Sequence, residues 1–418
     1  MVTAMAQNGS RPPHAASQRP WLFALLIAPM AVLSNGIYGG VLSYLMSRQG
    51  IDPARQSTVV ALLTLPQTIY FLWSPLTDFW LARRRWLLLG AIGAAFAVAV
   101  ALRSVPLDAP RTIALLFTGG CLAQLVVASC GGLLGMLHGE TVRRRASGFY
   151  QAGSLGFGAL ALFALTMLAQ WMSLTDLGLC MAALIALPGL ASLWAPDHGL
   201  QNTGGLLPTL RTIGSEFRAT FLRWNSIPYL ACMVLPMGSG ALSGLLPGLA
   251  VDYHVDGAHV AWINGVGGSL LCCAGSLAAG LAVTRLRSVF YYALIASTNL
   301  IPLAVLWLGP LTPATYLIGS LLMLLTIGAC YGAFTNVVLD FLGPSGKSGS
   351  ARYSLINSLG NVPVAYVAYV DGRGYARWGP HGMPGIDLCL SVIGLTVLLL
   401  LAWRQPATLV EAEAAIVP

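Results

Sequence analysis

The chain has 418 residues, of which 56% are hydrophobic and only 9% are charged, whereas an average soluble domain carries about a quarter charged residues. This excess of apolar side chains excludes a soluble protein and indicates a protein of the lipid bilayer. The formal net charge of +8 is explained by the basic residues that orient a membrane protein, so we expect no nucleic-acid partner.

Long apolar stretches follow one another along the whole chain, and a helix needs about 20 mostly apolar residues to cross a bilayer. They are predicted as helices because lipid offers no partner for backbone amides. The first half contains Trp21–Met46, Ser57–Trp73, Trp86–Arg103, Thr112–Leu137, Gly148–Gln170 and Leu177–Trp194. The second half contains Pro228–Leu249, His259–Thr284, Val289–Leu308, Thr315–Val338, Arg352–Val370 and Leu388–Trp403. The predicted fold is an all-α membrane protein with twelve transmembrane helices in two six-helix bundles.

A polar segment separates the two predicted bundles. The expected domains are an N-terminal tail (1–20), a first bundle (21–194), a linker (195–227), a second bundle (228–404) and a C-terminal tail (405–418). Within the linker, apolar residues recur at helical spacing among arginines, which predicts an amphipathic helix on the membrane surface. A plain connecting segment is the alternative.

The basic residues indicate how the chain is oriented in the membrane. With the N-terminus placed in the cytoplasm, 16 of the 22 lysines and arginines fall on the cytoplasmic side, as the positive-inside rule requires. We therefore expect a multi-pass protein of a bacterial cytoplasmic (inner) membrane with both termini inside. The eight cysteines fall in predicted helices, where cysteine packs as a small apolar residue, so we expect no metal site and no cofactor.

The most specific motif lies between the second and third predicted helices. It reads Ser-Pro-Leu-Thr-Asp-Phe-Trp-Leu-Ala-Arg-Arg-Arg-Trp from Ser74 to Trp86. This resembles the loop signature of the major facilitator superfamily, in which a small residue and an aspartate precede a basic cluster. Asp78 matches the aspartate, and the basic run is matched by Arg83, Arg84 and Arg85. The resemblance implies two parallel repeats that work by alternating access.

The motif also suggests how the two halves are held together. An aspartate at a helix end can meet the positive N-terminus of a facing helix and pair with an arginine. We expect Asp78 and Arg352 to latch the halves when the cytoplasmic side is closed. In the second half, Arg285 occupies the equivalent place, and its expected partner is Glu140. The alternative is that the arginines only orient the chain.

Two segments narrow the resemblance. Residues 65–78 and 351–361 look like the peptide, acetyl-CoA and drug transporter branch of the superfamily, which includes peptidoglycan-fragment permeases and siderophore permeases. This implies a siderophore-like or peptide-like substrate. The chain lacks the extra spans of the longer peptidoglycan-fragment permeases, which counts against a muropeptide.

Polar side chains inside the predicted helices are candidates for a substrate cavity, because such residues usually face the bundle interior. They are Asn35, Tyr38, Gln67, Tyr70, Gln124, Tyr150, Gln151, Asn264, Asn299, Tyr331, Asn336, Asn357 and Asn361. Hydrogen bonding between helices is the alternative role. No carboxylate lies at a predicted bilayer centre, so Asp340 is the remaining candidate for proton coupling, with pairing to Arg285 or Arg352 as its alternative.

These features predict a secondary active transporter of a small organic solute, not an enzyme. The expected partners are a small-molecule substrate, the lipid bilayer and a proton gradient, and the expected state is a monomer. Drug or metabolite efflux by the same fold is one alternative. A membrane sensor or scaffold without transport is another, although the chain has no sizeable soluble domain to serve as an output surface.

Overall fold

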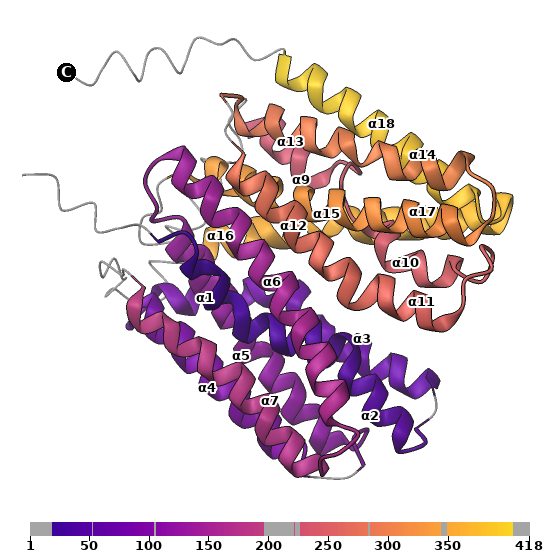
Figure 1. Cartoon of the computed structure of the whole chain (residues 1–418). Helices are drawn as coiled ribbons and strands as arrows, with labels where there is room; N and C mark the ends of the chain where they lie inside the picture. Colours follow the sequence, from indigo (N-terminus) through magenta and orange to yellow (C-terminus); the bar gives the residue numbers. More distant parts are fainter. Residues whose placement is uncertain are drawn as a thin grey trace, which may run out of the picture.

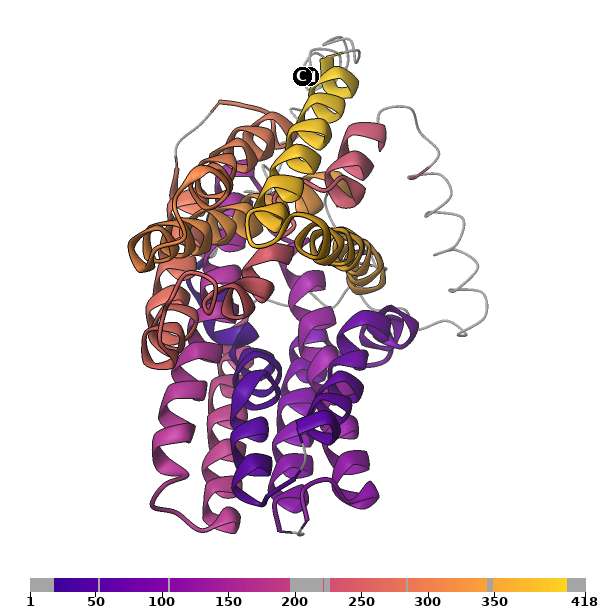
Figure 2. The same ribbon diagram turned by 90° about the vertical axis from the view of Figure 1, so that its right-hand side faces the viewer.

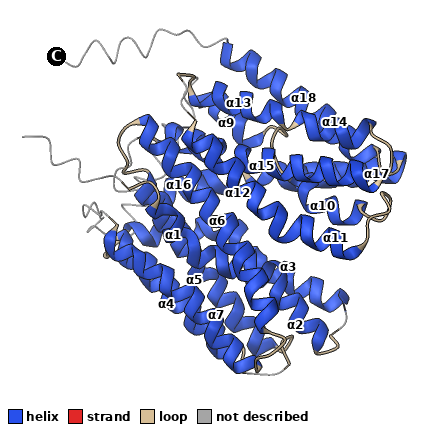
Figure 3. Ribbon diagram, in the orientation of Figure 1, coloured by secondary structure: helices blue, strands red, loops and turns tan. Residues whose placement is uncertain are grey.

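The computed structural model describes residues 19–51, 53–103, 106–195, 221, 226–282, 285–343 and 349–403. Every regular element in these residues is a helix (Figure 3). The first half contains α1 (Leu22–Met30), the π-helix η1 (Ala31–Val41), α2 (Leu42–Arg48), α3 (Pro53–Ile69), the 3₁₀ turns η2 (Tyr70–Leu72) and η3 (Ser74–Asp78), α4 (Arg83–Ala101), α5 (Pro110–Leu134), α6 (Glu140–Leu168), α7 (Leu174–Gly189) and the 3₁₀ turn η4 (Leu190–Trp194).

The second half is more interrupted than the first. It contains α9 (Ile227–Val234), α10 (Ala241–Leu249), α11 (Gly257–Trp262), the π-helix η6 (Ile263–Gly267), α12 (Gly268–Leu281), α13 (Ser288–Thr298), α14 (Leu300–Leu308), α15 (Pro313–Leu342), α16 (Gly349–Leu359), α17 (Asn361–Trp378) and α18 (Gly382–Trp403).

Consecutive helices of the described chain join into twelve rods, as predicted. Eight of the rods are long and apolar enough to cross a bilayer without interruption. The other four are the second, seventh, eighth and eleventh, and each is broken near a proline or glycine: Pro66, Pro236, Gly265 and Gly360. The twelfth helix begins at Gly382 and not at Leu388, because two glycines, a proline and an aspartate interrupt the apolar pattern in its first two turns.

The rods form two bundles, one from each half of the chain (Figure 1). The first bundle packs around one buried cluster that includes Leu33 and Val98, and the second bundle packs around clusters that include Leu303 and Val337. A further buried cluster contains residues of both halves, among them Val126 and Tyr353. The bundles therefore share a core where they meet.

The bundles approach each other most closely at one end. There α16 packs against α5 and η3, while α6 packs against α12 and α15. We call this the closed end and define it by Asp78, Gly148, Gly280 and Ser350. Figure 2 views the molecule from the opposite side, where α2 and α10 lie.

Glycines permit the closest crossing between the bundles. A Cβ atom on Gly148 of α6 would lie 2.7 Å from the Cα of Gly280 in α12. At the same place, Ser276 donates a hydrogen bond to the Gly148 carbonyl at 3.2 Å. Close backbone contact through small residues is how helices associate in membranes, where lipid is as apolar as the side chains.

Most of the predicted linker and both predicted tails lie outside the described residues. The predicted amphipathic helix falls mainly in 196–220 and 222–225, which belong to this part. The boundaries of the tails and linker therefore remain predictions.

Candidate functional site

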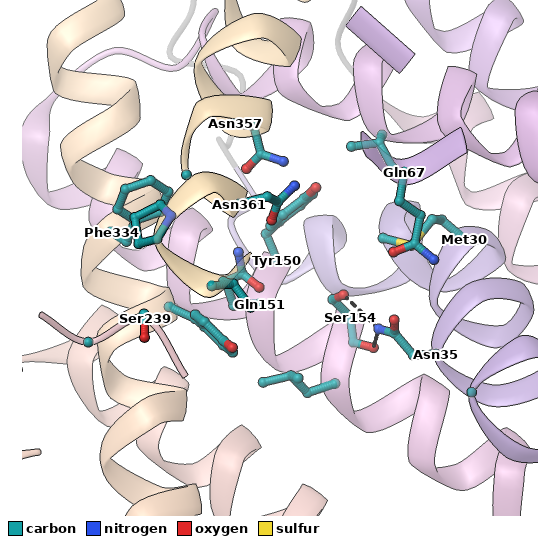
Figure 4. Close-up of a pocket in the computed structure, with 18 of the residues that line it drawn as sticks. Met30, Asn35, Gln67, Tyr150, Gln151, Ser154, Ser239, Phe334, Asn357 and Asn361 are labelled. Carbon is teal, nitrogen blue, oxygen red and sulfur yellow. Dashed lines mark hydrogen bonds between the residues drawn. The ribbon is translucent and has the colours of Figure 1, made fainter. Parts of the chain in front are cut away.

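A cavity of about 520 Å³ lies between the two bundles (Figure 4). Its volume falls within the range of about 300–1,000 Å³ that small-molecule sites occupy. Most of the polar residues predicted for a cavity line it: Asn35, Gln67, Tyr70, Gln124, Tyr150, Gln151, Tyr331, Asn357 and Asn361. The cavity therefore collects amide and phenol groups from both halves of the chain.

The remaining lining residues are uncharged as well. They add the hydroxyls of Ser154, Ser239 and Ser269 and apolar surface that includes Met30 and Phe334. None of the residues that line the cavity is Asp, Glu, Lys, Arg or His. Such a surface offers hydrogen-bond donors and acceptors to a ligand but no group that would pair with a full charge.

The sequence did not single out one part of this surface, the break between α9 and α10. Met237, Gly238 and Ser239 lie in this break and line the cavity. Gly238 and Gly240 have φ angles of 61° and 75°, which glycine adopts without steric cost. A proline followed by two glycines inside an apolar stretch is a signal for such a break, because irregular backbone is tolerated at membrane depth where it lines a cavity.

Several cavity amides are already hydrogen-bonded to the protein. Asn35 donates to the Ser154 carbonyl at 3.0 Å, and Gln151 donates to the Thr335 hydroxyl at 2.8 Å across the two bundles. By contrast, the side-chain nitrogen of Gln124 is buried and has no hydrogen-bond partner among the described residues. An unsatisfied buried donor is costly, so Gln124 is the amide best placed to bind a ligand or water.

Aromatic and amide side chains close the cavity toward the closed end. Asn357 donates to the Tyr70 hydroxyl at 3.1 Å, which joins the two bundles. Beside them the rings of Tyr150 and Tyr353 meet edge to face at 6.4 Å and 81°. Asn35 and Asn361, in contrast, are exposed. Solvent therefore reaches the cavity, although Tyr70, Asn357 and the two tyrosine rings shut it off from the closed end.

At the closed end, Asp78 of the first half contacts α16 of the second. Its carboxylate accepts hydrogen bonds from the backbone N–H groups of Ser350 and Ala351, at 3.1 and 2.9 Å. Arg83 donates two further hydrogen bonds to the same carboxylate. The side chains of Asp78 and Arg83 are 0% and 2% exposed. Burial raises the pKa of the Asp78 carboxyl, and the Arg83 charge and the two amides oppose that shift.

The family to which the chain belongs follows from its sequence as a whole. The family model of the Major Facilitator Superfamily matches residues 24–365. The chain belongs to the Major Facilitator Superfamily. Members of this superfamily are transporters and not enzymes, and they bind small-molecule substrates.

Solved structures agree with this assignment at the level of the fold. The human organic anion transporter MFSD10 (TETRAN) is 15% identical, with a TM-score of 0.67 over 93% of this chain and 100% of that chain. The proton:xylose symporter XylE, solved with 6-bromo-6-deoxy-D-glucose, is 13% identical, with a TM-score of 0.64 over 91% of this chain and 94% of that chain. The comparison with curated proteins gave no match.

The predicted latch between Asp78 and Arg352 is replaced in the structure by a different pairing. Asp78 meets the N-terminus of α16, but its guanidinium partner is Arg83 and not Arg352. Arg352 donates to the Leu342 carbonyl at 3.2 Å. Arg84 is half-buried and Arg85 is exposed. The Asp78 carboxylate already accepts four hydrogen bonds, from the backbone N–H groups of Ser350 and Ala351 and from the guanidinium of Arg83.

The second predicted pair does not form either. Glu140 lies 3.9 Å from Arg144, one turn along α6, whereas Arg285 is exposed. The first half contributes a different contact: Arg143 lies 3.7 Å from Asp340 of α15. Asp340 also accepts hydrogen bonds from Tyr229 at 3.0 Å and Ser288 at 2.5 Å. Asp340 therefore links the bundles, and its cationic partner is neither Arg285 nor Arg352.

Four of the predicted cavity residues do not line the cavity that the structure describes. Tyr38 is buried and donates to the Leu116 carbonyl at 2.5 Å, and Asn299 accepts from Thr326 at 2.9 Å. Asn336 is buried in α15, and the side chain of Asn264 lies outside the described part of the chain. No group of three or more metal-ligating residues occurs among the described residues.

Proposed function

We propose that this chain is a secondary active transporter that moves a small, uncharged polar organic solute, siderophore-like or peptide-like, by alternating access. The uncharged cavity between the bundles is the observation that carries this proposal. Amides and hydroxyls recognise a ligand rich in the same groups through hydrogen bonds, whose net value is about 0.5–1.5 kcal/mol each. A free carboxylate or phosphate would enter this cavity without a partner for its charge, at a high desolvation cost.

The basic residues support an orientation for the structure. Because arginines gather on the cytoplasmic side of membrane proteins, the closed end with Arg83 and Arg143 is proposed to face the cytoplasm. The cavity would then be open toward the outside in this state. The proposed setting is a bacterial cytoplasmic membrane, and a single chain suffices because it contributes both bundles to the cavity.

The substrate class is tested by thermal shift on the purified full-length protein. The ligands are ferric and metal-free siderophores, an anhydro-muropeptide, acetyl-CoA and several drugs. A ligand at 100 times its Kd adds about 2.7 kcal/mol to the free energy of unfolding. A shift with a siderophore or peptide compound supports the proposal, whereas a shift with drugs alone supports efflux. A panel without any shift counts against this substrate class.

Gln124 offers a direct test of the cavity. Replacing Gln124 by Leu is expected to weaken binding of the ligand that shifts the melting point by about two- to tenfold, the value of one hydrogen bond. The stability of the ligand-free protein should not fall, since the lost nitrogen has no protein partner in the described chain. Isothermal titration calorimetry measures the affinity.

Asn299→Leu is the matched control for this substitution. It breaks the bond to Thr326 away from the cavity, so it should lower the melting temperature and leave the Kd unchanged. If Gln124→Leu left the Kd unchanged, the Gln124 side chain would not contribute to ligand binding.

Asp340 is proposed to hold the two bundles together, because it pairs with Arg143 of the first bundle and accepts hydrogen bonds from Tyr229 and Ser288 of the second. Asp340→Asn is expected to weaken the closed end only about two- to fivefold, since the ion pair is partly exposed and such pairs contribute about 0.2–1 kcal/mol. Distances between spin labels on the two bundles measure this change. If Asp340→Asn changed the pH dependence of these distances, proton coupling would be the better interpretation of Asp340.

A further inference from the structure

Two buried aspartates outside the cavity lie on neighbouring helices of the second bundle. Asp371 lies in α17 and Asp387 lies in α18. Their side chains are 0% and 4% exposed, and the two carboxyl groups interact electrostatically. Neither is used by the cavity or by the contacts of the closed end. A buried carboxyl pair is costly in a membrane protein and marks a functional group by default.

The fold brings these carboxyl groups together through a glycine crossing. A Cβ atom on Gly374 would lie 2.7 Å from the carbonyl oxygen of Gly382, and one on Gly382 would lie 2.2 Å from the carbonyl oxygen of Gly374. The backbones of α17 and α18 therefore touch there. Asp371 lies one turn before Gly374, and Asp387 lies in the second turn of α18.

The pair has few hydrogen-bond donors. Neither carboxylate oxygen of Asp371 has a hydrogen-bond partner among the described residues. Asp387 accepts one hydrogen bond, from Ser391 at 3.2 Å. An ionised carboxylate needs several donors or a cation when it is buried, so this environment does not satisfy two negative charges.

The nearby cations are held elsewhere. Arg373 donates to Tyr369 at 2.7 Å, Arg377 stacks over Trp378, and His381 contacts the Gly309 carbonyl at 3.0 Å. The helices packed against α17 and α18 are α9, α10, α13, α14 and α16. Of these, α10 and α14 have no titratable side chain. The others carry Tyr229, Cys232, Tyr291, Tyr292, Arg352 and Tyr353, and Asp252 beyond α10 accepts from Tyr375.

We propose that Asp371 and Asp387 form a proton-binding site that holds one proton between them in this state. Two neighbouring carboxylates buried in apolar surroundings are not both ionised, so one proton stays on the pair. The pair then carries a single negative charge.

The site is connected to the cavity along one face of α17. Val364 of α17 lines the cavity, and Asp371 follows it by seven residues, which places both on the same face of a helix of 3.6 residues per turn. The separation between Val364 and Asp371 is about 10 Å along the axis. A change in the protonation of the pair that moves α17 would therefore reach the cavity wall.

The test is the melting temperature of the full-length protein between pH 5 and pH 9, with the proton itself as the ligand. A free aspartate ionises near pH 3.9, so the folded state binds a proton that the unfolded chain has released. Stability therefore falls as pH rises, by up to about tenfold in the folding equilibrium constant per pH unit. Asp371→Asn and Asp387→Asn should each flatten this slope.

Asp252→Asn is the matched control, because it removes a carboxylate of the same bundle that does not face the pair. It should keep the wild-type slope. Infrared spectra should show the C=O stretch of a protonated carboxyl in the wild type and lose it in both variants of the pair. If the melting temperature depended on pH equally in the wild type and in all variants, the proposal would be overturned. It would also be overturned if sodium at fixed pH stabilised the wild type and did not stabilise Asp371→Asn and Asp387→Asn, because the site would then bind sodium. None of these measurements requires a substrate, so they do not depend on the proposed function.

Discussion

Replacing Asp78 by Asn is expected to open the closed end and shift the ratio of closed to open molecules at least tenfold toward open. The substitution leaves the buried Arg83 without its counter-charge and turns an amide group toward N–H donors of α16. Removing one partner of a buried ion pair costs about 3–5 kcal/mol. Two of the four hydrogen bonds of Asp78 cross to the second bundle, so part of this cost destabilises the closed state alone. A destabilisation of about 1.4 kcal/mol changes the ratio of closed to open molecules by a factor of ten.

Spin labels on Arg85→Cys and Arg285→Cys measure this shift, since both positions are exposed at the closed end, one on each bundle. Protein without the added cysteines gives the background signal from native ones. Asp108→Asn is the control, because the pair of Asp108 with Arg55 is partly exposed and lies within the first bundle. A distance distribution that Asp78→Asn leaves unchanged would rule out the latch.

The helical rods could be predicted from the sequence because a bilayer imposes one dominant requirement on each span. Apolar length and the pairing of backbone amides determine where helices lie, and hydropathy reports both. The breaks within four rods were not predicted, because a stretch such as Pro228–Leu249 stays apolar across Pro236 and Gly238. Their consequence is specific: the broken backbone supplies part of the cavity wall.

The partner of Asp78 depends on local geometry that the sequence pattern does not contain. Trp80 has a φ angle of 58°, which is uncommon for a residue with a side chain, and the turn there brings Arg83 back onto Asp78. The pattern does indicate an aspartate that meets a helix N-terminus. It does not show which guanidinium accompanies it, because that choice is made by a single turn of the backbone.

The cavity residues illustrate a second limit. A polar residue in a membrane helix needs a partner, but the sequence does not show whether that partner is a neighbouring helix or a ligand. Tyr38 and Asn299 find theirs within one bundle, whereas Gln124 and Asn361 face the cavity. Asp387 precedes the predicted twelfth helix by one residue, so the hydropathy pattern does not place it inside the membrane.

Replacing Gly148 by Leu is expected to prevent the two bundles from closing, with a shift of about tenfold to a hundredfold toward the open form. The first atom of the new side chain would lie 2.7 Å from the Gly280 Cα and 2.9 Å from the Ser276 carbonyl oxygen. Both neighbours are backbone atoms of α12, so neither can turn away as a side chain would. Overpacking of this kind costs about 1–3 kcal/mol, and separation of α6 from α12 relieves it.

The same pair of spin labels measures the effect, and circular dichroism establishes that the helices remain. Gly244→Ala is the matched control, because a Cβ atom at Gly244 in α10 meets no atom within 4 Å. That change should stabilise the protein by about 0.4–1 kcal/mol through the unfolded state and leave the distances unaltered. If Gly148→Leu kept the closed-end distances of the wild type, the crossing of α6 and α12 would not control closure, and Asp78 with its α16 contacts would have to hold the bundles together without it.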